Sequence, residues 1–436
     1  MPQAAANNRP LCGRPAFAPL SLLYCLFHPM LFSRRNFLLG TVAAPLIAAK
    51  KKAAPDKKKG ALEKPNIILI VVDELPAWML GAYGNKEVRS PNLDRLTQTG
   101  THFLNHFTSA PEARLGAATL YTGRTPMQIG PEGAIAPADV TLDKLLAGAG
   151  YTCHAPGSLS AAEITTSATK FLGQQSAGKP FFLNLRYSEL RPPYDSIPQK
   201  YVDLYASQPF ADYSREAPAP NARAGRELMA DRVPVLRKVA GAITYLDDSI
   251  EAVLTQIYNK QLIDQTLIVF TSTCGSLYGR HGLWDSGDAS EPPNMYDEVV
   301  KTPMVWSWPG RVPALATQVE LVSAYDLVPS LCDLLDIEVP ERNLCGRSYK
   351  LLATGKRLPK KQTWRTTVFA QYKDTGMARV ERYKVVLRNG GKGPNELYDL
   401  ASDASETNNQ ADNDQFVSVK NTLSGELAQW KQKYSA

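Results

Sequence analysis

The apolar run Asn66-Ile67-Ile68-Leu69-Ile70-Val71-Val72, followed at once by Asp73-Glu74, is the clearest indication of the fold class. A strand that is apolar on both faces belongs to a parallel sheet that helices cover on both sides. Two further apolar runs lie at residues 180–185 and 267–270, and segments 142–149 and 238–258 carry apolar residues at helical spacing. The sequence therefore predicts an α/β fold with a mostly parallel central sheet flanked by helices.

The carboxyl ends of these strands are the expected place of a ligand site. In open parallel sheets ligands bind in the crevice beyond these ends. Asp73 and Glu74 follow the first apolar run, and Thr273 and Cys274 follow the run at 267–270. We expect these four side chains to gather at one edge of the sheet.

The formal net charge of +7 is concentrated at the amino terminus. Residues 1–49 hold four Arg and no acid, and residues 50–64 hold seven Lys against two acids, which leaves −2 for residues 65–436. A globular part with this charge has no general electrostatic attraction for nucleic acid. We therefore expect no nucleic-acid partner.

The amino-terminal tail has the pattern of an export signal. Ser33-Arg34-Arg35-Asn36-Phe37-Leu38 opens an uncharged stretch that ends at residue 49, which is typical of a twin-arginine signal. Met30 offers a start for it, and residues 50–63 form a basic linker. The 13 apolar residues fall short of a membrane-spanning helix. We expect export to the periplasm or cell envelope and no membrane contact beyond the signal; a buried or membrane-surface helix and a retained anchor stay open as alternatives.

Four cysteines remain after the leader, at wide and irregular spacings: Cys153, Cys274, Cys332 and Cys345. An exported protein is permitted disulfides, but a chain of this size does not depend on them. The sequence favours buried free thiols.

A series of motifs runs in order along the chain. They are Lys64–Glu74, Gly81–Asn85, Ser90–Leu96 and Leu120–Arg124, followed by His281–Asp285, Thr302–Met304 with Trp308–Gly310, Gly346–Ser348 and Glu396–Leu400. In order and spacing these motifs resemble the sulfatase family over roughly residues 64–430. The resemblance implies an alkaline-phosphatase-like fold, with an N-terminal domain over 64–340 and a smaller C-terminal α+β subdomain over 341–436.

The resemblance also implies where the nucleophile should lie. Members carry a Cys or Ser, modified to formylglycine, in a Cys/Ser-x-Pro-x-Arg signature shortly before a Thr-Gly-Arg. Here the flanking Ala110-Pro111 and Thr122-Gly123-Arg124 fix the register without a gap, which places Ala113 at the nucleophile position and Ala117 at the signature Arg. A methyl group is not a nucleophile, so we expect the reaction centre to be lost.

Other positions implied by the resemblance are substituted too. The family holds a divalent cation, usually calcium, with oxygen-rich ligands. Asp73 and Glu74 remain as part of that set, whereas Thr273 and Cys274 stand at its lost positions. We expect calcium to be lost and no cofactor to replace it. The family's Lys and His positions are occupied by Ser158, Ser160, Arg191 and Ser286.

Loss of a metal would leave Asp73 and Glu74 without a positive partner. A buried charge without a partner costs several kcal/mol. Arg114 and Arg191 are the candidate partners, as ion pairs in place of the metal or as contacts for an anionic ligand.

Several residues could support a different chemistry at this site. Glu112, Ser109 and Thr119 lie near the expected nucleophile, Cys274 and His281 could form a thiol and base, and the same two with Asp73 and Glu74 could form a zinc set. Packing, helix-terminal and capping roles are favoured for the first three, and a buried thiol for Cys274.

The sequence is compatible with two functions. The first is an exported, non-catalytic member of the family that binds a sulfated or otherwise anionic small ligand or glycan, or a protein partner. The second is an active sulfuric or phosphoric ester hydrolase with an unorthodox site. The oligomeric state stays open.

Overall fold

A computed structural model describes residues 64–157, 160–211, 213, 215–223, 225–339 and 343–435. The predicted signal over 1–49, the basic linker over 50–63 and Ser158 lie outside these residues. The predicted domain boundary falls at residues 340–342, which lie outside them as well.

The centre of the fold is a seven-stranded sheet in the order β4-β5-β1-β6-β7-β2-β8. Strand β1 (Asn66–Val72) is buried along its whole length and pairs in parallel with β5 (Phe181–Tyr187) and β6 (Thr266–Ser272). Strand β7 (Met304–Ser307) runs antiparallel to β6 and to β2 (Thr101–Phe103), while β8 (Ala316–Gln318) and β4 (Thr152–His154) pair in parallel at the two ends. The predicted mostly parallel sheet is confirmed.

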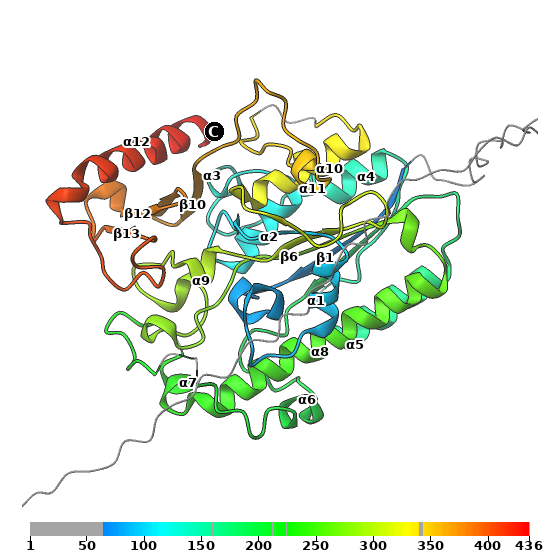
Figure 1. Cartoon of the computed structure of the whole chain (residues 1–436), viewed down its shortest axis with the longest axis horizontal. Helices are drawn as coiled ribbons and strands as arrows, with labels where there is room; N and C mark the ends of the chain where they lie inside the picture. Colours follow the sequence, from blue (N-terminus) through cyan, green and yellow to red (C-terminus); the bar gives the residue numbers. More distant parts are fainter. Residues whose placement is uncertain are drawn as a thin grey trace, which may run out of the picture. The chain divides into compact units, whose positions relative to one another are not determined.

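Helices cover both faces of this sheet (Figure 1). Side chains alternate along a strand, so Ile68, Ile70 and Val72 face α1 (Pro91–Gln98), α5 (Ala161–Gly173) and α8 (Arg232–Asn259). Ile67, Leu69 and Val71 face the helices of the other layer, which are α2 (Ala113–Thr122), α4 (Leu142–Gly148), α10 (Leu327–Leu335) and α11 (Lys350–Ala353). Burial on both faces explains why β1 is an unbroken apolar run.

A second sheet lies in the C-terminal part. Its four antiparallel strands are β10 (Val368–Tyr372), β11 (Thr375–Arg379), β12 (Tyr383–Arg388) and β13 (Glu396–Asp399). The last helix, α12 (Val417–Tyr434), packs on this sheet through Leu423, Leu427 and Trp430. The predicted smaller α+β part is confirmed.

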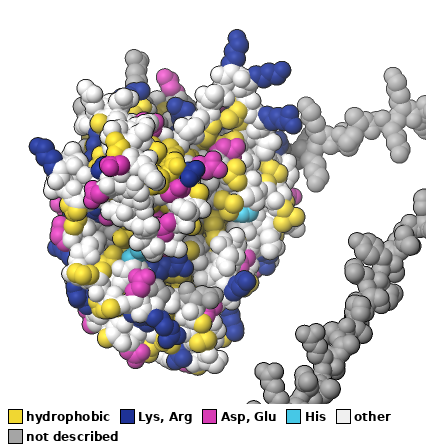
Figure 2. Space-filling model, turned by 60° about the vertical axis from the view of Figure 1, so that its left-hand side comes forward, with side chains coloured by type: hydrophobic (Ala, Val, Ile, Leu, Met, Phe, Trp, Pro, Cys, Tyr) yellow, Lys and Arg dark blue, Asp and Glu magenta, His cyan; other side chains and the backbone are white. Residues whose placement is uncertain are grey.

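Short elements connect these layers. They are α3 (Pro126–Ile129), α6 (Gln199–Asp203), α7 (Arg226–Ala230), α9 (Asp297–Val300), β3 (His106–Phe107) and β9 (Val322–Ser323), with 3₁₀ turns at Ala77–Met79, Gly81–Tyr83, Ile263–Gln265, Arg280–Gly282, Gly287–Ala289, Ala324–Asp326, Asn389–Gly391 and Asp414–Phe416. Among the described residues, no helix is both long and apolar enough for a membrane span. On the face in Figure 2, basic and acidic side chains are interspersed.

The cysteines of the described part are all free thiols. Cys274 and Cys332 are buried as predicted, and Cys345 is half-buried. The prediction is wrong for Cys153, which is exposed because it lies on the short edge strand β4.

Candidate functional site

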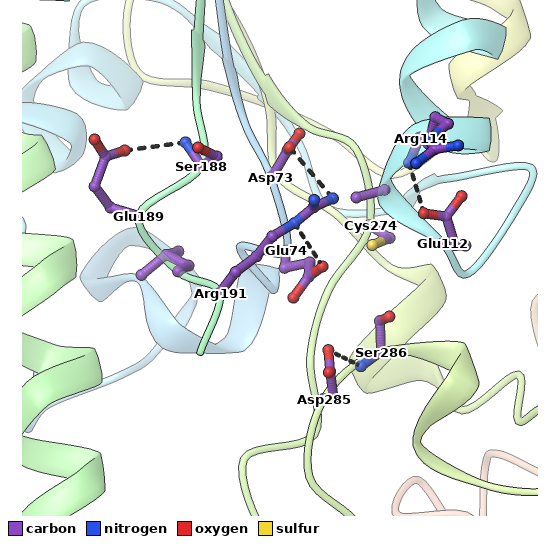
Figure 3. A network of polar contacts seen from close by, with 12 residues as sticks. Asp73, Glu74, Glu112, Arg114, Ser188, Glu189, Arg191, Cys274, Asp285 and Ser286 are labelled. Carbon is purple, nitrogen blue, oxygen red and sulfur yellow. Dashed lines mark hydrogen bonds and ion pairs between the residues drawn. The ribbon is translucent and has the colours of Figure 1, made fainter. Parts of the chain in front are cut away.

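The register of the three central strands brings a set of charged side chains together. Val72 at the end of β1 lies beside Tyr187 of β5 and Ser272 of β6. Asp73 and Glu74 therefore lie next to the carboxyl ends of β5 and β6. Thr273 and Cys274 follow directly after β6. Figure 3 shows this edge, with the start of α2 beside it.

Asp73 is held by two arginines. Arg186, near the end of β5, donates from Nε to Oδ1 of Asp73 at 2.9 Å and from Nη2 to Oδ2 at 3.0 Å, a bidentate pair. Nη2 of Arg191 lies 3.5 Å from the same Oδ2, and Nε of Arg191 lies 3.0 Å from Oε1 of Glu74. The side chain of Asp73 is only 3% exposed, against 34% for Arg186 and 41% for Arg191. The carboxylate is thus buried beneath two guanidinium groups that reach solvent on their outer side.

Glu74 shares its environment with a third acid. Both Glu74 and Asp285 adopt positive φ, 61° and 93°, a region that non-glycine residues seldom enter. Burial raises the pKa of Glu74 well above its usual range, Asp285 raises it further, and Arg191 opposes the shift. Asp285 also accepts a 2.8 Å hydrogen bond from the backbone N–H of Ser286. We define the acid–arginine cluster as Asp73, Glu74, Asp285, Arg186 and Arg191.

Thr273 and Cys274 follow β6 beside this cluster and are fully buried. Burial raises the pKa of the Cys274 thiol well above its usual range, and Glu74 and Asp73 raise it further. A thiol in this setting stays protonated and is a poor nucleophile and a poor ligand for a hard cation. Oγ1 of Thr273 is buried without a hydrogen-bond partner in the described part of the chain.

Helix α2 begins at Ala113 and is capped by Glu112. The Glu112 carboxylate accepts hydrogen bonds from the backbone N–H groups of Arg114 at 2.9 Å and Leu115 at 2.8 Å. The capping interpretation of Glu112 is confirmed, and its carboxylate engages two of the N–H groups with which a helix start would otherwise attract an anion. Ala113 and Ala117 are buried.

Close packing explains the small residues in α2. A Cβ atom added to Gly116 would lie 2.3 Å from the backbone oxygen of Thr273, so the helix touches the end of β6 there. The side chain of Arg114 is exposed and points away from Asp73 and Glu74 (Figure 3). The ion pairs with the two acids come instead from Arg191 and from Arg186.

The serine positions fall around the cluster. Ser160 caps α5 in a capping box with Glu163, and Ser286 is buried next to Asp285. An open groove of about 580 Å³ borders the cluster and is lined by Arg191 together with Ser160, Glu163, Ser188, Glu189 and Asp195. The groove therefore gives Arg191 a surface that a ligand can reach.

The alternative residues are engaged elsewhere. His281 stacks on Tyr296 with ring centroids 3.7 Å apart, and its Nε2 lies 3.4 Å from Oε2 of Glu298. Thr119 donates to the backbone oxygen of Leu115 within α2, and Ser109 is buried. Within the described ranges, no group of three or more His, Cys, Asp and Glu side chains is arranged for a metal ion. This geometry favours structural roles for these groups.

The predicted site residues do not include Arg186 and Asp285. The sequence does contain an indication for Arg186, because it is the one charged residue in the apolar run Phe181-Phe182-Leu183-Asn184-Leu185-Arg186-Tyr187 and lies near the carboxyl end of that run. Asp285 lies in a loop motif, and its approach to Glu74 depends on the backbone turn with positive φ, which has no counterpart in a sequence pattern.

Two family models match the chain. The model described as Sulfatase matches residues 65–161 and 153–337. The model described as N-sulphoglucosamine sulphohydrolase, C-terminal, matches residues 279–433. Together these matches extend over both the central sheet and the C-terminal sheet, and they confirm the predicted family.

Individual proteins are similar over most of the chain. An ulvan-active sulfatase of Formosa agariphila is 23% identical over 477 residues, which covers 90% of this chain and 87% of that protein. Human arylsulfatase A is 28% identical over 364 residues, which covers 67% of this chain and 68% of that protein. A solved structure of a protein in complex with its substrate D-glucosamine-2-N,6-O-disulfate has a TM-score of 0.74 at 17% identity, covering 85% of this chain and 98% of that one. The last likeness confirms the predicted fold.

Proposed function

Because this chain belongs to the sulfatase family and is related to sulfuric ester hydrolases, we propose that it is an exported, non-catalytic member that binds a sulfated glycan. The observation that carries the proposal lies at the start of α2. There the nucleophile position in the family register is Ala113, and the Glu112 carboxylate engages two backbone N–H groups of the helix. The site thus has a methyl group and an anion where a sulfatase needs a nucleophile and room for an anionic sulfate.

The residues at the family's metal positions do not fit calcium. Both oxygens of Asp73 accept hydrogen bonds from Arg186, and Glu74 pairs with Arg191. The remaining positions offer a buried hydroxyl, Thr273, and a protonated thiol, Cys274. Calcium prefers six to eight oxygen ligands, mainly carboxylate and carbonyl groups. We therefore derive no step through a metal ion, and propose that calcium binding has been lost.

The kind of ligand is suggested by the relatives. One similar protein is an ulvan-active sulfatase, and a solved structure with the same fold holds D-glucosamine-2-N,6-O-disulfate. In this chain Arg191 offers a half-exposed guanidinium to the groove, but Glu163, Glu189 and Asp195 line it as well. These acids limit the negative charge that the groove accepts, so we expect a lightly sulfated glycan to bind better than a heavily sulfated one.

Turnover and binding are tested together on the purified protein. Aryl sulfate and phosphate esters are offered to the wild type, to Ala113→Cys, and to a variant that adds Leu115→Pro, Ala117→Arg, Thr273→Asp, Cys274→Asn and Ser286→Lys, each made with formylglycine-generating machinery present. Catalytic groups that act as a unit are strongly non-additive, so the wild type and the single variant should show no turnover. Turnover by the wild type would return the chain to the active hydrolases with an unorthodox site.

Binding is measured with matched sulfated and desulfated oligosaccharides, using wild type and Arg191→Ala. Saturable binding of the sulfated form, weakened at least about tenfold by Arg191→Ala, is expected from the loss of one charge-assisted contact. Equal binding of the sulfated and desulfated oligosaccharides would show that the protein does not recognise the sulfate group and would contradict this proposal.

Export is proposed from the sequence, because Arg34 and Arg35 lie outside the described residues. Replacing both with Lys should retain the protein in the cytoplasm, since the twin-arginine pathway reads these side chains. A control with Arg9 and Arg14 replaced by Lys should leave export unchanged. Export of the Arg34→Lys, Arg35→Lys variant at the wild-type level would refute this part.

A further inference from the structure

We propose that the guanidinium groups of Arg186 and Arg191 together stand in for a divalent cation, and that they occupy a latent cation site formed by the acids around them. This exchange rests on the proposed function for the assignment of Asp73 and Glu74 to metal positions. Cation binding and stability can be measured independently of turnover, so failure of the two proposals can be distinguished.

The charges of the acid–arginine cluster support the replacement of a divalent cation by two guanidinium groups. Two guanidinium groups bring a total charge of +2, as one divalent cation does, and arginine keeps its charge at every pH that a folded protein meets. Arg186 donates to both oxygens of Asp73. Arg191 forms ion pairs with Asp73 and with Glu74, as Figure 3 shows. The Asp73 carboxylate is therefore compensated from inside the chain.

The two arginines also connect the elements that meet at the site. Arg186 comes from β5, contacts Asp73 after β1, and has its Nη2 3.4 Å from the backbone oxygen of Ala113 at the start of α2. Arg191 comes from the loop after β5 and reaches Asp73 and Glu74. A metal ion crosslinks ligands from separate segments in the same way. Here side chains provide the crosslink, which needs no ion from outside.

Removal of the guanidinium groups would expose an oxygen-rich set of donors. Asp73 and Glu74 would lose their partners, Asp285 lies beside Glu74, and Oγ1 of Thr273 is already buried without a hydrogen-bond partner among the described residues. Carboxylate oxygens are preferred ligands of calcium and magnesium, and truncation of two long side chains leaves space for an ion with its bound water. The arginines thus exclude a cation by charge and by volume at once.

The test compares calcium binding by calorimetry and melting temperature with and without millimolar calcium. The proteins are wild type, Arg191→Ala, Arg186→Ala with Arg191→Ala, and the double variant with Asp73→Asn added. Arg223→Ala is the matched control, because it removes an arginine from an ion pair with Glu291 in which both partners are exposed. Wild type and the control should show no calcium binding and no change in melting temperature with calcium.

The double variant should melt lower than wild type by roughly 5 °C or more without calcium, since it leaves buried acids without partners. It should regain part of this loss with calcium, with a dissociation constant of about 10⁻⁴ to 10⁻³ M, and Asp73→Asn should abolish the gain. If the double variant does not fold without the ion, calcium-dependent folding supports the proposal. If it does not fold at all, Arg191→Ala decides, and the proposal requires its melting temperature to rise with calcium. Calcium binding by wild type would overturn the proposal, and so would a folded double variant that neither binds calcium nor melts higher in its presence.

Discussion

The acid–arginine cluster and a second group of buried charges use ion pairs in different ways. The second group, which we call the C-terminal network, consists of Lys384, Asp297, Glu406 and Arg379. Nζ of Lys384 on β12 lies 3.0 Å from Oδ1 of Asp297 on α9 and pairs with Glu406, and Nη2 of Arg379 lies 3.2 Å from Oδ2 of Asp297. Lys384 is fully buried, whereas the arginines of the cluster are about one third to two fifths exposed.

This difference separates two roles for buried carboxylates. In the C-terminal network both cations are buried with the acids, so the group can only join β11, β12 and the loop after β13 to α9. In the acid–arginine cluster the acids are inaccessible but the cations face a groove, so they hold the acids and remain open to a ligand. Exposure of the cation, and not burial of the acid, distinguishes the candidate site.

The largest effect is expected from Lys384→Met. Loss of the buried ammonium leaves Asp297 and Glu406 with less compensation and should lower the free energy of unfolding by about 3–5 kcal/mol. Lys373→Met is the control, since Lys373 pairs with Asp288 at the surface and should cost less than about 1 kcal/mol. Urea unfolding measures both. Equal losses in the free energy of unfolding of the two variants would mean that the buried lysine contributes no more to stability than the exposed one.

Asp73→Asn should have the next largest effect. The substitution leaves Arg186 and Arg191 without their common carboxylate, but both can turn to solvent, so we expect a loss of about 2–3 kcal/mol in the free energy of unfolding. Glu251→Gln, which removes the acid from an exposed pair with Arg95, should cost less than about 1 kcal/mol. A variant as stable as wild type would mean that the guanidinium groups do not need Asp73.

Glu406→Gln should change the pH dependence of stability. Burial raises the pKa of Glu406 from 4.5 to about 8, and Lys384 opposes the shift. Because the pKa is higher in the folded state, the stabilisation is complete below pH 4.5 and is lost as the pH rises through about 8. The free energy of unfolding of wild type minus that of the variant should thus fall with pH, by at most about 1.4 kcal/mol per pH unit. Urea unfolding at a series of pH values measures it, and a difference that rises with pH would contradict the assignment.

The smallest effect is expected from Arg114→Ala. Arg114 is exposed, and Glu112 contacts its backbone N–H, which alanine retains. Its free energy of unfolding should stay within about 0.5 kcal/mol of wild type, and sulfated-ligand binding should stay unchanged. Arg191→Ala is the comparison, since it should lower the free energy of unfolding and also weaken binding of the sulfated ligand. Weaker ligand binding by Arg114→Ala would extend the site to the start of α2.

Periodicity and the order of motifs along the chain are enough to predict the fold class and the family of this protein. The apolar run at residues 66–72 predicts a doubly buried parallel strand, because a strand covered by helices on both faces excludes polar side chains. The ordered motifs predict the family, and the gapless register before Thr122 assigns Ala113 and Ala117 to their positions. These inferences need only local pattern and spacing along the chain.

Which side chains pair with Asp73 and Glu74 depends on the tertiary fold. Arg186 and Asp73 are 113 residues apart and meet because β5 lies beside β1 in one particular register. Arg114 is far closer in sequence to Asp73 and Glu74 than Arg186 or Arg191 is, yet its side chain is exposed to solvent on α2. Asp285 reaches Glu74 through backbone turns at positive φ. Ion pairs form between side chains that the fold brings within about 4 Å, and no distance along the sequence encodes that approach.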